Sequence, residues 1–181
     1  MKELEWKQVG VYVGIPVLTV LLMVVKWGKL YSAELILRGI LTVFGYVAAV
    51  GDLRDKRVPN RLVGAMLGVW ILVIVPHLFF QTERTLALTL SGAVGFLLAG
   101  IVFLLVYLIS RKGLGGGDVK LMAVSGLYLG LNGVLPTMLY GSVLAAVAGC
   151  VLILTKRIGP KDSIPLVPFL YAGMLLTMFI R

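Results

Sequence analysis

The chain has very few residues of the types that usually build disulfides, metal sites or histidine-based catalysis. Its 181 residues include one cysteine, Cys150, and one histidine, His77. A disulfide needs two cysteines, and zinc sites are commonly built from several cysteine and histidine ligands. We therefore expect no metal, no cofactor and no histidine-based triad. Cys150 is interpreted as a packing residue in an apolar helix, and His77 as an interfacial side chain.

Long apolar runs dominate the rest of the sequence. Hydrophobic residues make up 60% of the chain and the mean hydropathy is +1.03, far from the composition of a soluble globular domain. The runs occupy residues 9–25, 35–50, 62–80, 86–109, 119–131, 134–154 and 164–180. A helix needs ~20 residues to cross ~30 Å of hydrocarbon, and the fifth run is the shortest. Since lipid excludes open sheet edges, we predict an all-α, polytopic helical membrane bundle with about seven transmembrane helices.

The distribution of basic residues predicts how this bundle is oriented. If the seven runs alternate in direction, five of the 17 lysines and arginines lie on one side: Lys26, Lys29, Arg38, Arg84 and Arg181. The remaining twelve (17 − 5) lie on the side of the N-terminus. Because cytoplasmic loops carry the excess of basic residues, we predict a multi-pass protein of the cell inner (cytoplasmic) membrane, with the N-terminus cytoplasmic and the C-terminus outside. The net charge of +9 then reflects topology, and no nucleic-acid partner is expected.

Acidic residues are scarce, with eight in the chain, and three aspartates stand at the ends of apolar runs on the predicted cytoplasmic side. Asp52 and Asp55 lie in "GDLRDKRVPNRL", and Asp118 lies in "GLGGGDVKLM". Basic residues flank Asp55 on both sides, so a solvated ion pair accounts for it. Asp118 is also explained as the N-cap of a helix, and Asp52 as a residue that marks a helix end.

As a pair, Asp52 and Asp118 favour a chemical role. An ionised carboxylate takes a proton from water while a protonated one donates a proton to a substrate carbonyl. Two close carboxylates share a proton and titrate as a unit. The glycines before Asp118 allow the backbone to approach a substrate closely or to adopt positive φ. The pair therefore predicts an aspartyl hydrolase, provided that the fold brings the two residues together.

Three motifs follow one another within residues 35–180. They are Asp52 with basic residues and then Pro59-Asn60, the GxGD sequence of Gly115, Gly117 and Asp118, and "IPLVPFLYAG" with Pro165 and Pro168. In this order they resemble the type IV prepilin (leader) peptidase family of GxGD aspartyl membrane proteases.

The resemblance implies a core of six helices with Asp52 and Asp118 as the catalytic dyad at the cytoplasmic face. It implies that the enzyme removes the short basic leader from prepilin-like membrane proteins, cutting after a glycine just before their hydrophobic helix. The glycines and prolines of the three motifs, together with Asn60, would support this site. The expected partners are prepilin-like substrates and the lipid bilayer.

The sequence departs from the larger family members in two ways. With one cysteine it lacks their N-terminal domain with paired CxxC motifs, so the resemblance is to a short form, and we expect peptidase activity without N-methyltransferase activity. It also carries the additional apolar run at 9–25. We predict that residues 1–34 form an extra transmembrane helix and loop, and that residues 35–181 form the peptidase-like domain.

Lys120, two residues after Asp118, has two interpretations. It either biases the ionisation of the dyad or meets an acidic residue of the substrate, or it anchors its helix at the membrane interface. Small residues at helical spacing predict close helix packing, namely Gly64/Gly68, Gly126/Gly130 and Gly141/Ala145/Gly149.

Two functions of other classes also fit the composition. A small transporter or channel could use the same carboxylates as ion or proton sites, although such sites usually lie near the middle of the membrane. A non-catalytic membrane scaffold would leave the stretch of glycines before Asp118 unexplained.

Overall fold

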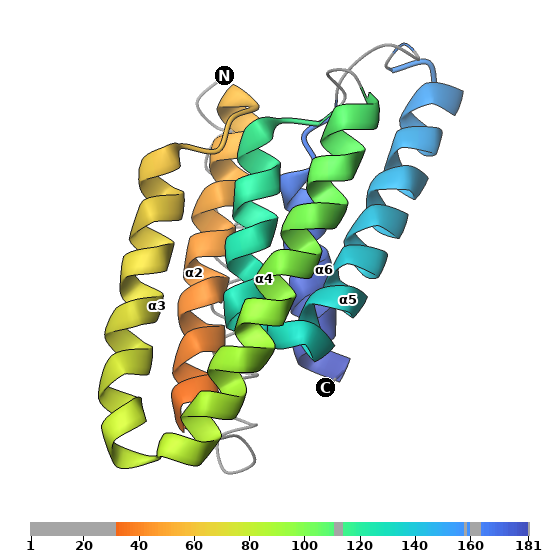
Figure 1. Ribbon diagram of the computed structural model, residues 1–181. Helices are drawn as coiled ribbons and strands as arrows, with labels where there is room; N and C mark the ends of the chain where they lie inside the picture. The colour runs from red at the N-terminus through yellow and green to blue at the C-terminus, as the bar shows by residue number, and fades with distance from the viewer. Residues whose placement is uncertain (1–31, 111–113, 158, 160–163, 181) are drawn as a thin grey trace, which may run out of the picture.

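The computed structural model describes residues 32–110, 114–157, 159 and 164–180, and all regular structure in these ranges is helical. The helices are α2 (Ser32–Asp55), α3 (Asn60–Phe80), α4 (Thr82–Ser110), α5 (Gly116–Leu154) and α6 (Val167–Ile180). Figure 1 shows them side by side in one bundle. The predicted span at 9–25 lies outside the described residues.

Four of these helices, α2 to α5, are long and apolar enough to cross a membrane. Large apolar side chains also cover the outside of the bundle; Leu72 is 73% exposed, Ile109 is 79% exposed and Leu154 is 81% exposed. Such a surface suits lipid rather than water. The chain is thus a multi-pass membrane protein whose described residues are all-helical in their regular structure.

Helix α6 is shorter than the apolar run that contains it. The run begins at residue 164, but the helix begins at Val167 and has 14 residues. Pro165 favours an extended conformation for the residue before it, which delays the helix. Pro168 lies in the first turn, where its missing N–H removes no intrahelical hydrogen bond.

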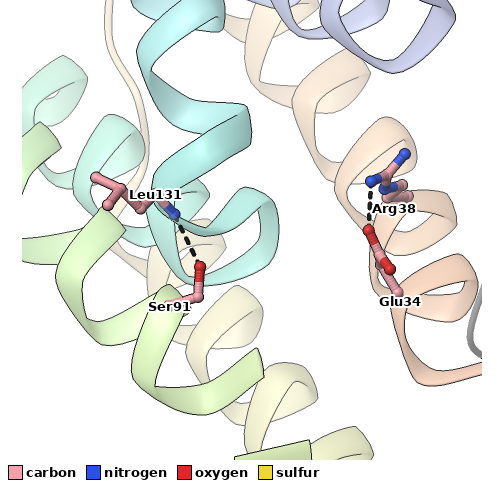
Figure 2. Close-up of polar contacts among 4 residues, drawn as sticks. All are labelled: Glu34, Arg38, Ser91 and Leu131. Carbon is pink, nitrogen blue, oxygen red and sulfur yellow. Dashed lines mark hydrogen bonds and ion pairs between the residues drawn. The ribbon is translucent and has the colours of Figure 1, made fainter. Parts of the chain in front are cut away.

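Helix α5 combines two runs that the sequence predicted as separate spans. Its 39 residues, about 58 Å of helix, exceed one membrane crossing. Gly130 departs from helical geometry, with φ 64° and ψ 178°, and the chain reverses its direction beyond this point. The first half runs beside α4 and the second half beside α6 (Figure 1). Ser91 of α4 holds the reversal, because its hydroxyl accepts a hydrogen bond from the amide of Leu131 at 3.1 Å (Figure 2).

Glycines let the two halves of α5 approach their neighbours closely. A Cβ at Gly95 of α4 would lie 2.6 Å from the carbonyl oxygen of Gly126, and one at Gly173 of α6 would lie 2.6 Å from the amide nitrogen of Gly141. The packing prediction is wrong for Gly64 and Gly68. Both are exposed, and within the described part of the chain no atom lies within 4 Å of the place where a Cβ of Gly64 or Gly68 would be.

The interpretation of Cys150 as a packing residue is also wrong. The side chain is exposed on the second half of α5, which places it on the outer surface of the bundle. The outward surface of a membrane protein is as apolar as its interior, and hydropathy alone does not distinguish the two.

The turn between α2 and α3, the start of α5 and the start of α6 lie at one end of the bundle (Figure 1). This end carries Asp52 and Asp118, and we call it the aspartate end. The opposite end carries the reversal at Gly130.

Candidate active site

Asp52 lies in the last turn of α2, and its side chain is 3% exposed. One carboxylate oxygen, Oδ2, accepts a hydrogen bond from the backbone amide of Val167 at 3.0 Å, and the backbone of Leu166 contributes a second interaction. Lys56, which follows the helix, is near enough to attract the carboxylate electrostatically. The first residue of α6 therefore holds the carboxylate of Asp52, 115 positions away in the chain.

Asp118 lies in the first turn of α5 and is 8% exposed. Its Oδ2 accepts a hydrogen bond from the amide of Gly115 at 3.1 Å, and its own amide donates to the carbonyl of Gly115 at 3.1 Å. Gly115 is the N-cap of α5, so the prediction of Asp118 as the N-cap is wrong; Asp118 is the third residue of the helix, and its carboxylate caps the helix start through the amide of Gly115. Capping leaves the second oxygen, Oδ1, available for other contacts.

The structure brings Asp52 and Asp118 to the same end of the bundle. They are close enough for their charges to interact. Two buried carboxylates in one place are costly unless hydrogen bonds hold them or one carries a proton. The backbone amides of Val167 and Gly115 supply such bonds, one to each residue.

The sequence predicts positive φ among the glycines before Asp118. For Gly115, Gly116 and Gly117 this expectation is wrong. Gly115 has φ −81°, Gly116 and Gly117 are helical, and Gly130 is the described glycine with φ in the left-handed region. The close approach seen in the structure is to the protein's own α2–α3 turn, whereas approach to a substrate stays a prediction. A Cβ at Gly117 would lie 3.0 Å from the Cβ of Val58, in the turn after Asp52.

The other motif residues surround this junction. Pro59 is the N-cap of α3, and its carbonyl accepts from the amide of Leu62. Asn60 accepts a hydrogen bond from Lys120 at 3.1 Å, so the structure joins two residues that the sequence named separately. Pro165 and Pro168 flank Leu166 and Val167, the segment that contacts Asp52.

One contributor to this region, the backbone amide of Val167, was not predicted from the sequence. Val167 binds Asp52 through its backbone amide, so its side chain gave no indication of this role. The neighbouring prolines, Pro165 and Pro168, are the feature of the sequence that indicates a fixed backbone there. Ser125 lies seven residues after Asp118, on the same face of α5. Its hydroxyl is fully buried and has no hydrogen-bond partner among the described residues.

A second polar feature lies at the opposite end of the bundle. A cavity of about 150 Å³ is bordered by residues that include Glu34, Arg38, Trp70, Ser91 and Gly130. Glu34 and Arg38 form an ion pair there (Figure 2). Gly130 is 12 residues from Asp118 along α5, about 18 Å of helix, so this cavity is separate from the aspartates.

The described ranges contain no group of three or more histidine, cysteine, aspartate or glutamate side chains that could hold a metal ion. The groups described at the aspartate end are two carboxylates, backbone amides and nearby lysines. Such a set is suited to proton transfer.

Comparison with known proteins finds several relatives that carry the same name. The prepilin leader peptidase/N-methyltransferase of Xanthomonas campestris pv. campestris is 32% identical over 120 residues, which cover 66% of this chain and 41% of that protein. The Bacillus subtilis protein of the same name is 28% identical over 72% of this chain and 50% of its own length, and that of Pseudomonas putida is 32% identical over 82% and 51%.

The chain spans about half the length of these curated relatives. No solved structure matches it significantly. The profile described as the type IV leader peptidase family matches residues 39–150, which is more than half of the chain and includes Asp52 and Asp118. The chain belongs to the type IV leader peptidase family.

Proposed function

We propose that this protein is a membrane aspartyl endopeptidase that removes the basic leader from type IV prepilin-like substrates. The observation that carries the proposal is the pair of buried carboxylates, Asp52 and Asp118, whose charges interact at one end of the bundle. The names of the relatives support the same reaction. Residues 35–181 would form the peptidase domain, without N-methyltransferase activity, and residues 1–34 would lie outside it.

The proposed reaction uses both aspartates and one water molecule. The ionised carboxylate takes a proton from the water, whose oxygen bonds to the scissile carbonyl carbon. The protonated carboxyl gives its proton to the carbonyl oxygen, forming a neutral tetrahedral intermediate. The C–N bond then breaks: the leaving amine takes up the proton that the first carboxylate received from water, and a hydroxyl of the intermediate gives its proton to the second carboxylate as the new carboxyl group forms. Each aspartate ends in a state from which the next cycle starts.

The proposed orientation places the aspartate end at the cytoplasmic face of the inner membrane. Arg54, Lys56 and Arg57 follow Asp52 at this end, and cytoplasmic loops carry such an excess of basic residues. A substrate whose basic leader stays in the cytoplasm and whose apolar helix lies in the bilayer would present its scissile bond at this depth.

The test is co-expression of the full chain with prepilin-like substrates, followed by measurement of substrate mass. Removal of the leader should occur with the unmutated chain and be lost with Asp52→Asn or Asp118→Asn. Asp55→Asn is the matched control, because Asp55 is exposed and lies one turn beyond Asp52 on α2. Equal membrane levels of all four proteins exclude loss of expression. Intact substrate with the unmutated chain, across several prepilins, would instead favour a transporter that uses these carboxylates as ion sites.

A further inference from the structure

The segment after Asp52 and the segment after Asp118 are joined by a hydrogen bond. Lys120 Nζ donates to Asn60 Oδ1 at 3.1 Å, across 60 positions of the chain. Both side chains are exposed, in a chain whose helices are mostly apolar. A lysine ammonium has three N–H groups, so the bond to Asn60 uses one of them.

This bond lies next to the contact of Gly117 with Val58. Val58 contacts Gly117, and Asn60 binds Lys120. The turn between α2 and α3 and the first turn of α5 therefore run side by side in the same direction. The first contact is steric and buried, and the second is polar and exposed. Together they attach the segment that follows Asp52 to the turn that carries Asp118.

The hydrogen bonds of the carboxylates themselves do not make this connection. The bond from Val167 joins Asp52 to α6, and the bond from Gly115 joins Asp118 to the cap of its own helix. Neither links α2 to α5. The separation of Asp52 and Asp118 therefore depends on other contacts between the two segments, such as those of Val58 and Asn60.

We infer that Lys120 is a positioning residue, which acts through Asn60 to hold the α2–α3 turn against α5 and so sets the separation of Asp52 and Asp118. The inference rests on the proposed peptidase function. A shift of about 1 Å between reacting groups lowers rates by about a hundredfold. An exposed bond of this kind contributes little to global stability, so its loss should appear in the rate of catalysis rather than in unfolding.

A direct role for the charge of Lys120 is the competing explanation, and Asn60 separates the two. Asn60→Leu removes the acceptor and leaves the charge in place. If Lys120 positions the dyad, Asn60→Leu and Lys120→Met should lower kcat by about the same factor, roughly tenfold, with KM unchanged within about twofold. If the charge acts directly, Asn60→Leu should keep full activity.

The experiment is a double-mutant cycle on the purified full chain in detergent, with a synthetic prepilin peptide that spans the cleavage site. The double variant Asn60→Leu/Lys120→Met should lose no more than either single variant, because both remove the same bond. Lys120→Arg and Asn60→Asp keep a donor and an acceptor and should restore most of the rate. Arg61→Met, an exposed charge beside Asn60, is the matched control and should leave kcat unchanged.

Thermal unfolding of each variant gives the second measurement. Midpoints within about 2 °C of the unmutated protein are expected, since an exposed pair is weak. Additive losses in the cycle, or full activity of Asn60→Leu, would overturn the inference while leaving the peptidase function intact. Absence of cleavage by the unmutated chain would instead overturn the proposed function.

Discussion

Gly117 packs directly against Val58. The second glycine of the GxGD sequence, next to Asp118, thus contacts the turn that follows Asp52. A Cβ added at Gly117 would lie 3.0 Å from Val58 Cβ, 3.1 Å from its carbonyl oxygen and 3.3 Å from its amide nitrogen. Two of these three atoms belong to the backbone, which does not move aside as a flexible side chain would. For the preceding residue, Gly116, none of the described residues has an atom within 4 Å of the Cβ position.

We therefore expect opposite results from alanine at adjacent positions. Gly117→Ala should displace the α2–α3 turn by a few tenths of an ångström and lower the cleavage rate by about tenfold. Gly116→Ala should keep the rate and raise helix stability by up to about 1 kcal/mol, since alanine is the better helix former. Initial rates of leader removal and thermal unfolding measure both effects. Equal activity of the two variants would contradict this interpretation of the contact.

The amide of Val167 allows a single hydrogen bond to be removed. Val167 is the first residue of α6, a position that accepts proline without disturbing the helix. Val167→Pro should cost about 1–3 kcal/mol, because a buried oxygen of Asp52 loses its donor, and it should slow cleavage strongly. Val167→Ala keeps the amide. This variant should therefore lose free energy of unfolding but retain the cleavage rate. Cleavage by Val167→Pro at the rate of Val167→Ala would show that the bond is dispensable.

The contact between α5 and α6 should not tolerate a methyl group. A Cβ at Gly173 would lie 2.6 Å from the amide nitrogen of Gly141 and 2.7 Å from the carbonyl oxygen of Thr137, both backbone atoms. Gly173→Ala should lower the free energy of unfolding by about 3 kcal/mol, at the upper end of overpacking effects. Gly64→Ala and Gly68→Ala, at two exposed glycines of α3, are the controls and should be neutral or stabilising. Unfolding titrations in mixed micelles measure the difference.

The reversal of α5 can be tested with a second double-mutant cycle. Gly130→Ala should cost about 1–2 kcal/mol for a side chain in the left-handed region, and more because a Cβ there would lie 2.6 Å from Ser91 Oγ. Ser91→Ala should cost about 1–3 kcal/mol, since the amide of Leu131 loses its acceptor. The double variant should cost less than the sum, because removal of the Ser91 hydroxyl also removes the clash. Strict additivity of the unfolding free energies would contradict the arrangement in Figure 2.

The positions of the helices follow closely from hydropathy. The run at 62–80 corresponds to α3 at Asn60–Phe80, and the run at 86–109 to α4 at Thr82–Ser110. Helix ends extend past the runs because polar residues such as Asn60 and Thr82 sit at the interface at little cost. The reversal in α5 agrees with the prediction of two spans at 119–131 and 134–154, although the turn is made at Gly130, inside the first run, and not in the gap between the runs.

Contacts between residues far apart in the chain could not be predicted from the residue types alone. Asp52 and Asp118 stood out because carboxylates are rare in this chain, but the amide that binds Asp52 belongs to a valine with no polar side chain. Glycine spacing predicted contacts at Gly126 and Gly141 and failed at Gly64 and Gly68. Small residues permit close approach but do not require it, because the partner helix must also lie on that face.

The bond between Val167 and Asp52 has a consequence for biosynthesis. The ribosome completes α2 long before α6, since 115 positions separate the two residues. Until the later helix enters the bilayer, the carboxylate at the end of α2 lacks its amide donor. Maturation of the proposed protease would thus await the insertion of α6, and a nascent chain would not cut neighbouring proteins while it is still being made.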